Sequence, residues 1–288
     1  MNVGLVLSGG FARGAAQLGF IKALCEKIGR NSIKLISSSS IGCVNSLAIS
    51  ANCIDKLACI YCNSDFKNIT DFKNRLRHNF LNDTIDKLLS DETSNIEIPF
   101  YVTGTCLNKL STHYFLVNNT INRDELKKIL DISTTFPFVN GVMKKAFNNY
   151  YIDGGATDNI PVFPFLINNV DVLLILHCSS TYLPPQQIVN SNKIVIDVDV
   201  TAKCGDVSSF GVSKKNLTFL YNNGYGYGES FCKTVLSSDD IEKIKKNGQQ
   251  FMQSECKLRQ MKKKNFFNLV SILNKVQSSR GFLIDKQD

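Results

Sequence analysis

The sequence predicts an α/β fold, in which a mostly parallel sheet is flanked by helices and followed by a helical C-terminal extension. Short apolar strands alternate with segments of helical spacing through about residue 200. One segment, residues 170–178, is an almost continuous apolar run, which is typical of a parallel strand covered on both faces. The length of 288 residues and the hydrophobic fraction of 43% suit a large globular domain.

Each expected strand is a short apolar run bounded by turn residues, and each expected helix has an apolar face at helical spacing. We expect strands at residues 3–7, 34–37, 96–105, 113–117, 150–153, 170–178 and 193–200. We expect helices at residues 15–27, 41–51 and 122–132. Asn122 is the expected N-cap of the last helix, with Glu125 three residues further on.

The composition limits the chemistry. The three histidines, His78, His113 and His177, argue against a zinc site built on several histidines, and we expect neither a metal nor another cofactor. Cys59 and Cys62 form one CxxC pair, without the second pair that a zinc ribbon needs. No signal peptide or membrane-spanning run is apparent, so we expect all ten cysteines to be reduced thiols in a cytoplasmic compartment.

The first motif is a glycine-rich turn at residues 8–14, Ser-Gly-Gly-Phe-Ala-Arg-Gly, between the first strand and the first helix. Glycines there expose backbone N–H groups beside a helix N-terminus, which stabilises an anion. Phe11 departs from a dinucleotide-binding loop, and Gly14 is not followed by Lys-Ser/Thr, so both nucleotide-binding interpretations fail. The anion is then a phosphate or a reaction oxyanion, and a plain strand-to-helix turn is the alternative.

The second motif, Ser-Ser-Ser-Ile-Gly at residues 38–42, lies between the second strand and a helix of small residues. It is similar to a nucleophile elbow, in which a strained strand–turn–helix presents a serine hydroxyl at the sheet edge. Ser38 stands where the elbow usually has its first glycine. Ser40 is the preferred nucleophile because Gly42 follows two residues later and the helix starts at Ile41. A serine-rich helix N-cap is the alternative.

The third motif is Asp153-Gly154-Gly155, directly after a predicted strand. An aspartate at this place has its carboxylate held at the sheet edge, where ligands of open α/β sheets bind. An ordinary Asp-Gly turn is the alternative, and Asp158 is the rival carboxylate. A serine, a fixed carboxylate and a loop of backbone donors are together the parts needed for acyl transfer.

In this order and context, the three motifs resemble those of the patatin-like phospholipase family. Residues 9–14 are similar to its glycine-rich oxyanion-hole motif, residues 38–46 to its nucleophile elbow, and residues 153–162 to its Asp-Gly-Gly segment. The resemblance implies a patatin-like catalytic core at residues 1–200, with residues 201–288 as a helical extension packed on it.

The resemblance also implies a function, that of a lipid acyl hydrolase of the phospholipase A or lysophospholipase type. Such a serine esterase uses a Ser–Asp dyad and an acyl-enzyme, with Ser40 as nucleophile and Asp153 as general base. The backbone N–H groups of Gly9, Gly10 and Phe11 would then form the oxyanion hole. With a carboxylate as the base, the scarcity of histidine is no obstacle. An acyltransferase with the same dyad and a non-catalytic lipid- or protein-binding module are the alternatives.

Two further residues near these motifs have competing interpretations. We expect Arg13 to anchor its helix through a salt bridge rather than to add charge beside the glycine-rich loop. His177, near the end of a predicted strand, is kept as the rival base of a serine triad. Phe11 and Ser38 depart from glycines that are frequent in the family, which leaves the shape of the loop open.

Apolar residues at 136–147 and 163–165 flank the Asp-Gly-Gly segment, and we expect most of them to belong to the core. Lys144 and Lys145 favour a partly exposed, membrane-facing loop among them.

Residues 239–288 hold eleven basic and six acidic side chains, or +5 of the net charge of +8. This stretch predicts a basic helix that packs on the domain or lies on anionic lipid. We expect a phospholipid or other lipid ester as substrate, peripheral membrane contact through this helix, and no nucleic-acid partner.

Overall fold

One β-sheet forms the centre of the chain. The computed structural model describes residues 1–64, 66, 70–71, 74–75, 80–90, 95–137, 141–204 and 210–257. Eight strands in these residues join the sheet in the order β5-β6-β3-β2-β1-β7-β8, with β4 paired to β3. The strands are β1 (Val3–Leu7), β2 (Ile33–Ser38), β3 (Phe100–Cys106), β4 (Ser111–Val117), β5 (Lys144–Ala146), β6 (Asn149–Asp153), β7 (Val172–His177) and β8 (Ile194–Asp199).

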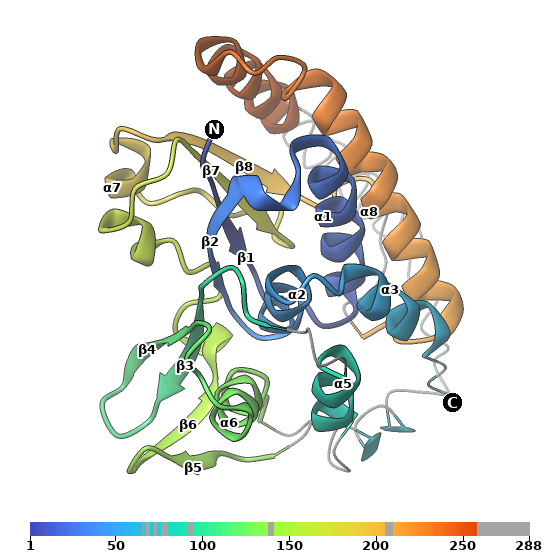
Figure 1. Cartoon of the computed structure of the whole chain (residues 1–288), viewed down its shortest axis with the longest axis vertical. Helices are drawn as coiled ribbons and strands as arrows, with labels where there is room; N and C mark the ends of the chain where they lie inside the picture. The colour runs from blue at the N-terminus through green and yellow to red at the C-terminus, as the bar shows by residue number, and fades with distance from the viewer. Residues whose placement is uncertain are drawn as a thin grey trace, which may run out of the picture.

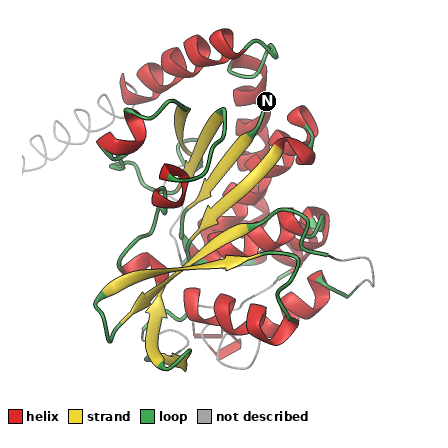
Figure 2. Ribbon diagram, turned by 60° about the vertical axis from the view of Figure 1, so that its left-hand side comes forward, coloured by secondary structure: helices red, strands yellow, loops and turns green. Residues whose placement is uncertain are grey.

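Five neighbouring strands, β3, β2, β1, β7 and β8, run parallel, whereas β4 and β6 run antiparallel to β3. The mostly parallel sheet confirms the predicted α/β fold, and Figure 2 shows its twisted strands among the helices. β4 pairs with β3 along one whole edge of that strand. The other edge of β3 is therefore shared by β2 and β6. There Ser38 pairs with Val102 and Asp153 pairs with Gly104, so β2 and β6 meet end to end.

Helices cover the two faces of the sheet unequally. The α-helices are α1 (Gly14–Ile28), α2 (Ile41–Ser50), α3 (Ile54–Asn63), α5 (Phe80–Leu88), α6 (Arg123–Ser133), α7 (Gln186–Val189) and α8 (Lys214–Thr234), and residues 241–257 are helical as well. The 3-10 helices are η1 (Phe11–Arg13), η2 (Arg30–Ser32), η3 (Gly154–Ala156) and η4 (Phe163–Leu166). The long helices contribute to the core on one face, and η4 and α7 contribute to the core on the other.

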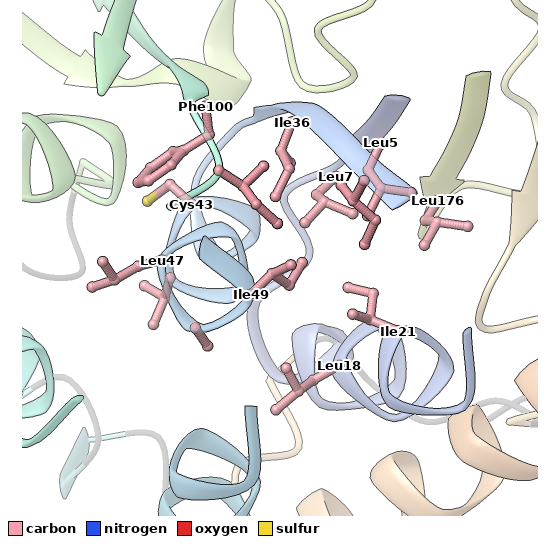
Figure 3. Packing of buried hydrophobic residues seen from close by; sticks show 14 of the residues in the cluster. Leu5, Leu7, Leu18, Ile21, Ile36, Cys43, Leu47, Ile49, Phe100 and Leu176 are labelled. Atoms are coloured by element: carbon pink, nitrogen blue, oxygen red, sulfur yellow. The ribbon is translucent and has the colours of Figure 1, made fainter. Parts of the chain in front are cut away.

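The alternation of side chains along each strand divides the core between these faces. In β1, Leu5 and Leu7 belong to the core under the long helices, while Val6 belongs to the core with Phe165 of η4. Figure 3 shows Leu5 and Leu7 close to Leu176 of the neighbouring strand and to side chains of α1 and α2. Burial of such side chains stabilises the fold by about 25 cal/mol per Å² of apolar surface.

The C-terminal part of the described chain packs on this core through α8, which lies alongside α1 (Figure 1). Gly19 of α1 and Gly224 of α8 each face the backbone of the other helix, where a Cβ would collide with a carbonyl oxygen. The two backbones therefore lie in direct contact, and a larger residue at either position would separate the helices. The domain boundary at residue 200 stays a prediction.

Most of the predicted elements are confirmed, with shifted ends. The first strand begins and ends as predicted, and Asn122 caps α6 by accepting a hydrogen bond from the N–H of Glu125 at 2.9 Å. The strand expected from residue 96 begins only at Phe100. The sequence analysis did not predict α3, α5 or β5, and α3 and α5 line the cavity of the candidate site described below.

The apolar residues that flank the Asp-Gly-Gly segment are mostly exposed, so the expectation that they belong to the core is wrong. Phe165 alone of those in the described residues is fully buried. The exposed ones are Phe136, Val142, Met143, Phe147 and Phe163. They lie in loops, beside the edge strand β5 or in η4, where the described chain places no further layer over them.

Several predictions concern residues outside the described part of the chain. They are those for His78, for the apolar residues Phe138 and Val139, and for the basic stretch from residue 258 onward. Among the helices that are described, none is both long enough and apolar enough to cross a bilayer.

Candidate active site

The turn between β2 and α2 places Ser40 in a strained backbone conformation. Ser40 has φ 53° and ψ −129°, a region that residues other than glycine rarely adopt. Gly42 makes the turn possible, because a Cβ there would lie 2.5 Å from the carbonyl oxygen of Leu7. Helix α2 can therefore begin directly against β1, as a nucleophile elbow requires.

Burial separates Ser40 from the neighbouring serines. Ser37, Ser38 and Ser39 are fully buried, whereas Ser40 is partly exposed and lines a cavity. The Ser38 hydroxyl donates a hydrogen bond to the carbonyl of Tyr101 at 3.0 Å, so the side chain that replaces the usual glycine is accommodated in the sheet. Of the four serines, Ser40 is the one whose hydroxyl can meet a ligand.

Asp153, the last residue of β6, lies against Ser40. The Ser40 hydroxyl donates a hydrogen bond to Oδ2 of Asp153 at 2.7 Å, and the N–H of Gly155 donates to Oδ1 at 2.7 Å. The side chain of Asp153 is nearly buried, and burial raises its pKa to about 6, against the lowering effect of these two hydrogen bonds. The structure thus brings together the serine and the carboxylate that the sequence analysis selected.

The end of α6 fixes the backbones of both residues. The N–H of Ser40 donates to the hydroxyl oxygen of Ser133 at 2.9 Å. The N–H of Asp153 donates to the carbonyl of Thr135 at 2.8 Å. Ser133 and Thr135 are completely buried, so both bonds lie in the protein interior. The sequence analysis missed Ser133, which only the fold brings to Ser40.

The glycine-rich loop also lies beside Ser40, at the end of β1. A Cβ at Gly9 would lie 2.9 Å from the Cβ of Ser40 and would collide with the side-chain oxygen of Asn159. Phe11 has φ 50°, the left-handed conformation that glycine adopts without strain. The loop is thus shaped as if for glycine, although a phenylalanine occupies this position.

The three amides that the sequence analysis selected differ in their hydrogen bonds. The N–H of Gly9 donates to the side-chain oxygen of Asn159 at 3.1 Å and to its carbonyl at 3.3 Å. Within the described residues, the N–H groups of Gly10 and Phe11 donate to no protein acceptor. Asn159 therefore ties the loop to the segment that carries Asp153, and two amides remain for a ligand.

A chain of buried amide and hydroxyl groups supports the loop from behind. Tyr61 donates to Asn45 at 3.0 Å, and Asn45 donates to the carbonyl of Gly14 at 3.0 Å and to Gln17 at 2.9 Å. Gln17 in turn donates to the carbonyls of Ser8 and Leu176. Buried polar groups that are paired in this way hold the turn between β1 and α1 in one conformation.

Arg13 and the two described histidines have partners other than the Ser40 hydroxyl. Arg13 donates a hydrogen bond to the carbonyl of Cys178 at 3.3 Å, which links η1 to the end of β7. His177 is buried with its Nε2 atom 3.4 Å from a carboxylate oxygen of Asp197 on β8. His113 lies on β4 and shares a hydrogen bond of 2.8 Å with the hydroxyl of Tyr151.

Asp158, the rival carboxylate, has its own partner. It accepts a hydrogen bond from the hydroxyl of Tyr114 at 2.5 Å, and its N–H donates to the carbonyl of Gly154. Burial raises the pKa of Asp158 as well. These contacts fasten the Asp-Gly-Gly turn to β4.

No group of three or more metal-ligating side chains occurs in the described residues.

An apolar cavity of about 100 Å³ opens beside Ser40. Its lining comes mainly from η1, α1, α2, α3, α5 and the start of α8. The apolar lining residues include Phe11, Ile41, Val44, Phe66, Phe80 and Leu217. None of the described apolar residues at 136–147 and 163–165 lines this cavity, which joins a nucleophilic hydroxyl to an apolar space.

A mostly parallel α/β sheet with a strained elbow serine, a hydrogen-bonded carboxylate and a glycine-rich loop defines the class of the α/β hydrolytic folds. The family model of the patatin-like phospholipases matches residues 5–166, more than half of the chain. The chain therefore belongs to the patatin-like phospholipase family, a family of lipid hydrolases. No curated protein matches its sequence.

Two solved structures have a similar fold at low sequence identity. VipD from Legionella pneumophila is 14% identical, with a TM-score of 0.45, and the match covers 81% of this chain and 67% of that one. ExoU in the ExoU–SpcU complex of the Pseudomonas aeruginosa type III secretion system gives 17% identity and a TM-score of 0.44, covering 96% and 63%. The chain thus spans about two thirds of the length of these proteins.

Proposed function

We propose that the chain hydrolyses carboxylic esters of lipids through an acyl-enzyme, with Ser40 as the nucleophile and Asp153 as the general base. The observation that carries this proposal is the hydrogen bond of 2.7 Å from the Ser40 hydroxyl to the Asp153 carboxylate. It lies at a strained elbow, beside an apolar cavity. A nucleophile that touches its base in this way needs no histidine between them.

The pKa of Asp153 suits a general base. At about 6, it leaves the carboxylate ionised at neutral pH and closer in basicity to the serine than an exposed aspartate, whose pKa is 3.8. Burial supplies this increase, so the same packing that positions Asp153 also adjusts its proton affinity.

The reaction begins when the Ser40 oxygen attacks the ester carbonyl carbon while Asp153 accepts the hydroxyl proton. The carbonyl oxygen becomes an oxyanion. The N–H groups of Gly10 and Phe11, which have no acceptor among the described residues, are available to stabilise it. Collapse of this intermediate breaks the bond to the alcohol, and Asp153 returns the proton to the leaving oxygen. Water then gives a proton to Asp153 and attacks the acyl carbon. Collapse of this second intermediate breaks the bond to the Ser40 oxygen, Asp153 returns the proton to that oxygen, and the fatty acid leaves.

The cavity favours a lipid acyl group over a polar one. Its lining is predominantly apolar, with Phe66 and Phe80 in edge-to-face contact at 5.4 Å between ring centres. Hydrocarbon chains gain free energy on entering such a site because apolar surface leaves water. Membrane contact through the basic C-terminal helix stays a prediction, since that stretch lies largely outside the described residues.

A fluorophosphonate probe and a soluble fluorogenic ester test the proposal together. We expect the probe to label wild type at Ser40 and to leave Ser40→Ala unlabelled, and Asp153→Asn to lose ester hydrolysis. Ser39→Ala is the matched control, because Ser39 is a buried neighbour whose hydroxyl has no partner within the described residues. Absence of labelling in folded wild type, or full activity of Ser40→Ala, would overturn the proposal and favour a binding module.

A further inference from the structure

Exposed apolar side chains follow α6 and precede β5, in a region where the sequence predicted core. Phe136 is 40% exposed, Met143 is 48% exposed and Val142 is 71% exposed. Large exposed apolar side chains are common when single, but a contiguous group marks a surface that meets a partner or a membrane. The question is whether these residues are contiguous with the cavity that holds Ser40.

Phe11 connects them to the cavity. Its side chain lines the cavity, and its ring packs edge-to-face on Phe136 at 5.1 Å and against Phe210 at 4.9 Å, between ring centres. Phe210 is 46% exposed. Three aromatic rings from three separate segments therefore form one cluster, and one of these rings lines the cavity.

The segment that precedes β5 continues this surface. Gly141 forms a β-bridge with Pro137, and a Cβ at Gly141 would lie 3.6 Å from the side chain of Thr135. The bridge pairs the residue that follows Phe136 with the residue that precedes Val142 and Met143. The same segment ends at β5, which Figure 1 shows at the edge of the molecule, close to α6.

The charges at this edge are basic. Lys145 on β5 is exposed, with its ammonium group 5.9 Å from the centre of the Tyr150 ring. Asp131 of α6, the nearby acid, is paired with Lys144 at 2.8 Å. An apolar surface bordered by an exposed lysine matches the interfacial region of a bilayer with anionic lipid.

We propose that a lipid-facing rim seats the cavity entrance on an anionic membrane surface. The rim consists of Phe11, Phe136, Phe210, Val142, Met143 and Lys145. The inference rests on the proposed function, because the rim would give the ester of a membrane lipid a water-free path from the bilayer to Ser40. It assigns membrane contact to the catalytic core itself and not to the C-terminal helix. Continuity of the rim with the cavity singles out a lipid surface as its occupant.

A tryptophan reporter tests the rim directly, because the chain contains no tryptophan. We expect Met143→Trp to show a blue-shifted emission when vesicles of phosphatidylcholine with phosphatidylglycerol are added, and a smaller shift with phosphatidylcholine alone. Ile167→Trp is the matched control: Ile167 is 84% exposed but follows η4, which packs on the other face of the sheet. No shift in Met143→Trp, or an equal shift in both variants, would overturn the rim.

A second variant separates the rim from the reaction. Val142→Glu/Met143→Glu should reduce hydrolysis of vesicle lipid by about tenfold or more while hydrolysis of a short soluble ester stays unchanged, and Val142→Leu/Met143→Leu should keep both. If wild type hydrolyses the soluble ester but the Glu variant acts on vesicles like wild type, the rim fails and the proposed function stands. If wild type hydrolyses neither substrate yet Met143→Trp reports insertion, the proposed function fails and the rim stands. Self-association of the chain through this surface, without vesicle binding, would also overturn the rim.

Discussion

Replacement of Asp153 by asparagine should stabilise the folded chain at neutral and alkaline pH while it removes ester hydrolysis. The carboxylate is buried at the end of β6, where its ionised form is costly. Asparagine keeps the shape of the side chain, and its carbonyl oxygen can still accept the N–H of Gly155, which now lies 2.7 Å from Oδ1. The substitution therefore removes a charge and preserves the packing.

The sign and size of the effect follow from the pKa. Asp153 has a pKa of about 6 in the folded chain against 3.8 as the reference, so between these values the folded state binds more protons than the unfolded state. The stabilising contribution of the protonated carboxyl is fully present below pH 3.8 and is lost as the pH rises through about 6. The loss is about 3 kcal/mol, at about 1.4 kcal/mol per pKa unit. Asparagine does not titrate and escapes this loss.

Urea unfolding of wild type and Asp153→Asn at about pH 4 and about pH 8 measures the difference. The variant should gain up to about 3 kcal/mol relative to wild type between the two pH values. Asp124→Asn is the control: Asp124 is exposed in the first turn of α6, where its charge favours the helix, so its loss should destabilise the folded chain slightly. A difference between Asp153→Asn and wild type that does not depend on pH would refute the argument.

Three further predictions concern activity. The kcat/KM of wild type on a soluble ester should fall as the pH drops below about 6, because Asp153 is then protonated; a pH–rate profile without this limb would contradict its role as base. Ser133→Ala leaves the buried N–H of Ser40 without its partner and should slow fluorophosphonate labelling by about tenfold, at a stability cost of about 1–3 kcal/mol in urea unfolding. Asn159→Ala leaves the N–H of Gly9 only the longer contact to the backbone carbonyl of residue 159 and so loosens the glycine-rich loop. It should lower kcat by about 10²-fold with an unchanged acid limb of the pH–rate profile, and a shift of this limb would mean that Asn159 acts on Asp153.

The sequence could predict the parts of the site whose geometry is local. The elbow could be predicted from Ser40 and Gly42 because a tight strand-to-helix turn restricts the residues that can occupy it. The start of α6 could be predicted from Asn122 because its side chain accepts a hydrogen bond from a backbone N–H only three residues away. The same holds for the end of β6, where Asp153 accepts a hydrogen bond from Gly155.

The remainder depends on contacts between distant segments. Ser133 lies 93 residues from Ser40, and Asn159 lies 150 residues from Gly9, so no local pattern marks either contact. The exposure of Val142 and Met143 was mispredicted for a related reason. An apolar run indicates burial only if another layer covers it, and these two residues precede β5, one of the edge strands of the described sheet. The antiparallel direction of β6 was likewise not evident from its own residues.

That direction explains how a Ser–Asp pair can work with no imidazole between the two groups. A direct hydrogen bond between serine and carboxylate requires the two backbones to be closer than in a triad, so both must be fixed. β6 enters antiparallel along the edge of β3 beyond the end of β2, which brings Asp153 to the elbow from the opposite direction. The buried end of α6 then fixes both backbones, through Ser133 to Ser40 and through Thr135 to Asp153. A substitution that loosens this end of α6 should therefore separate the pair without touching either reacting side chain.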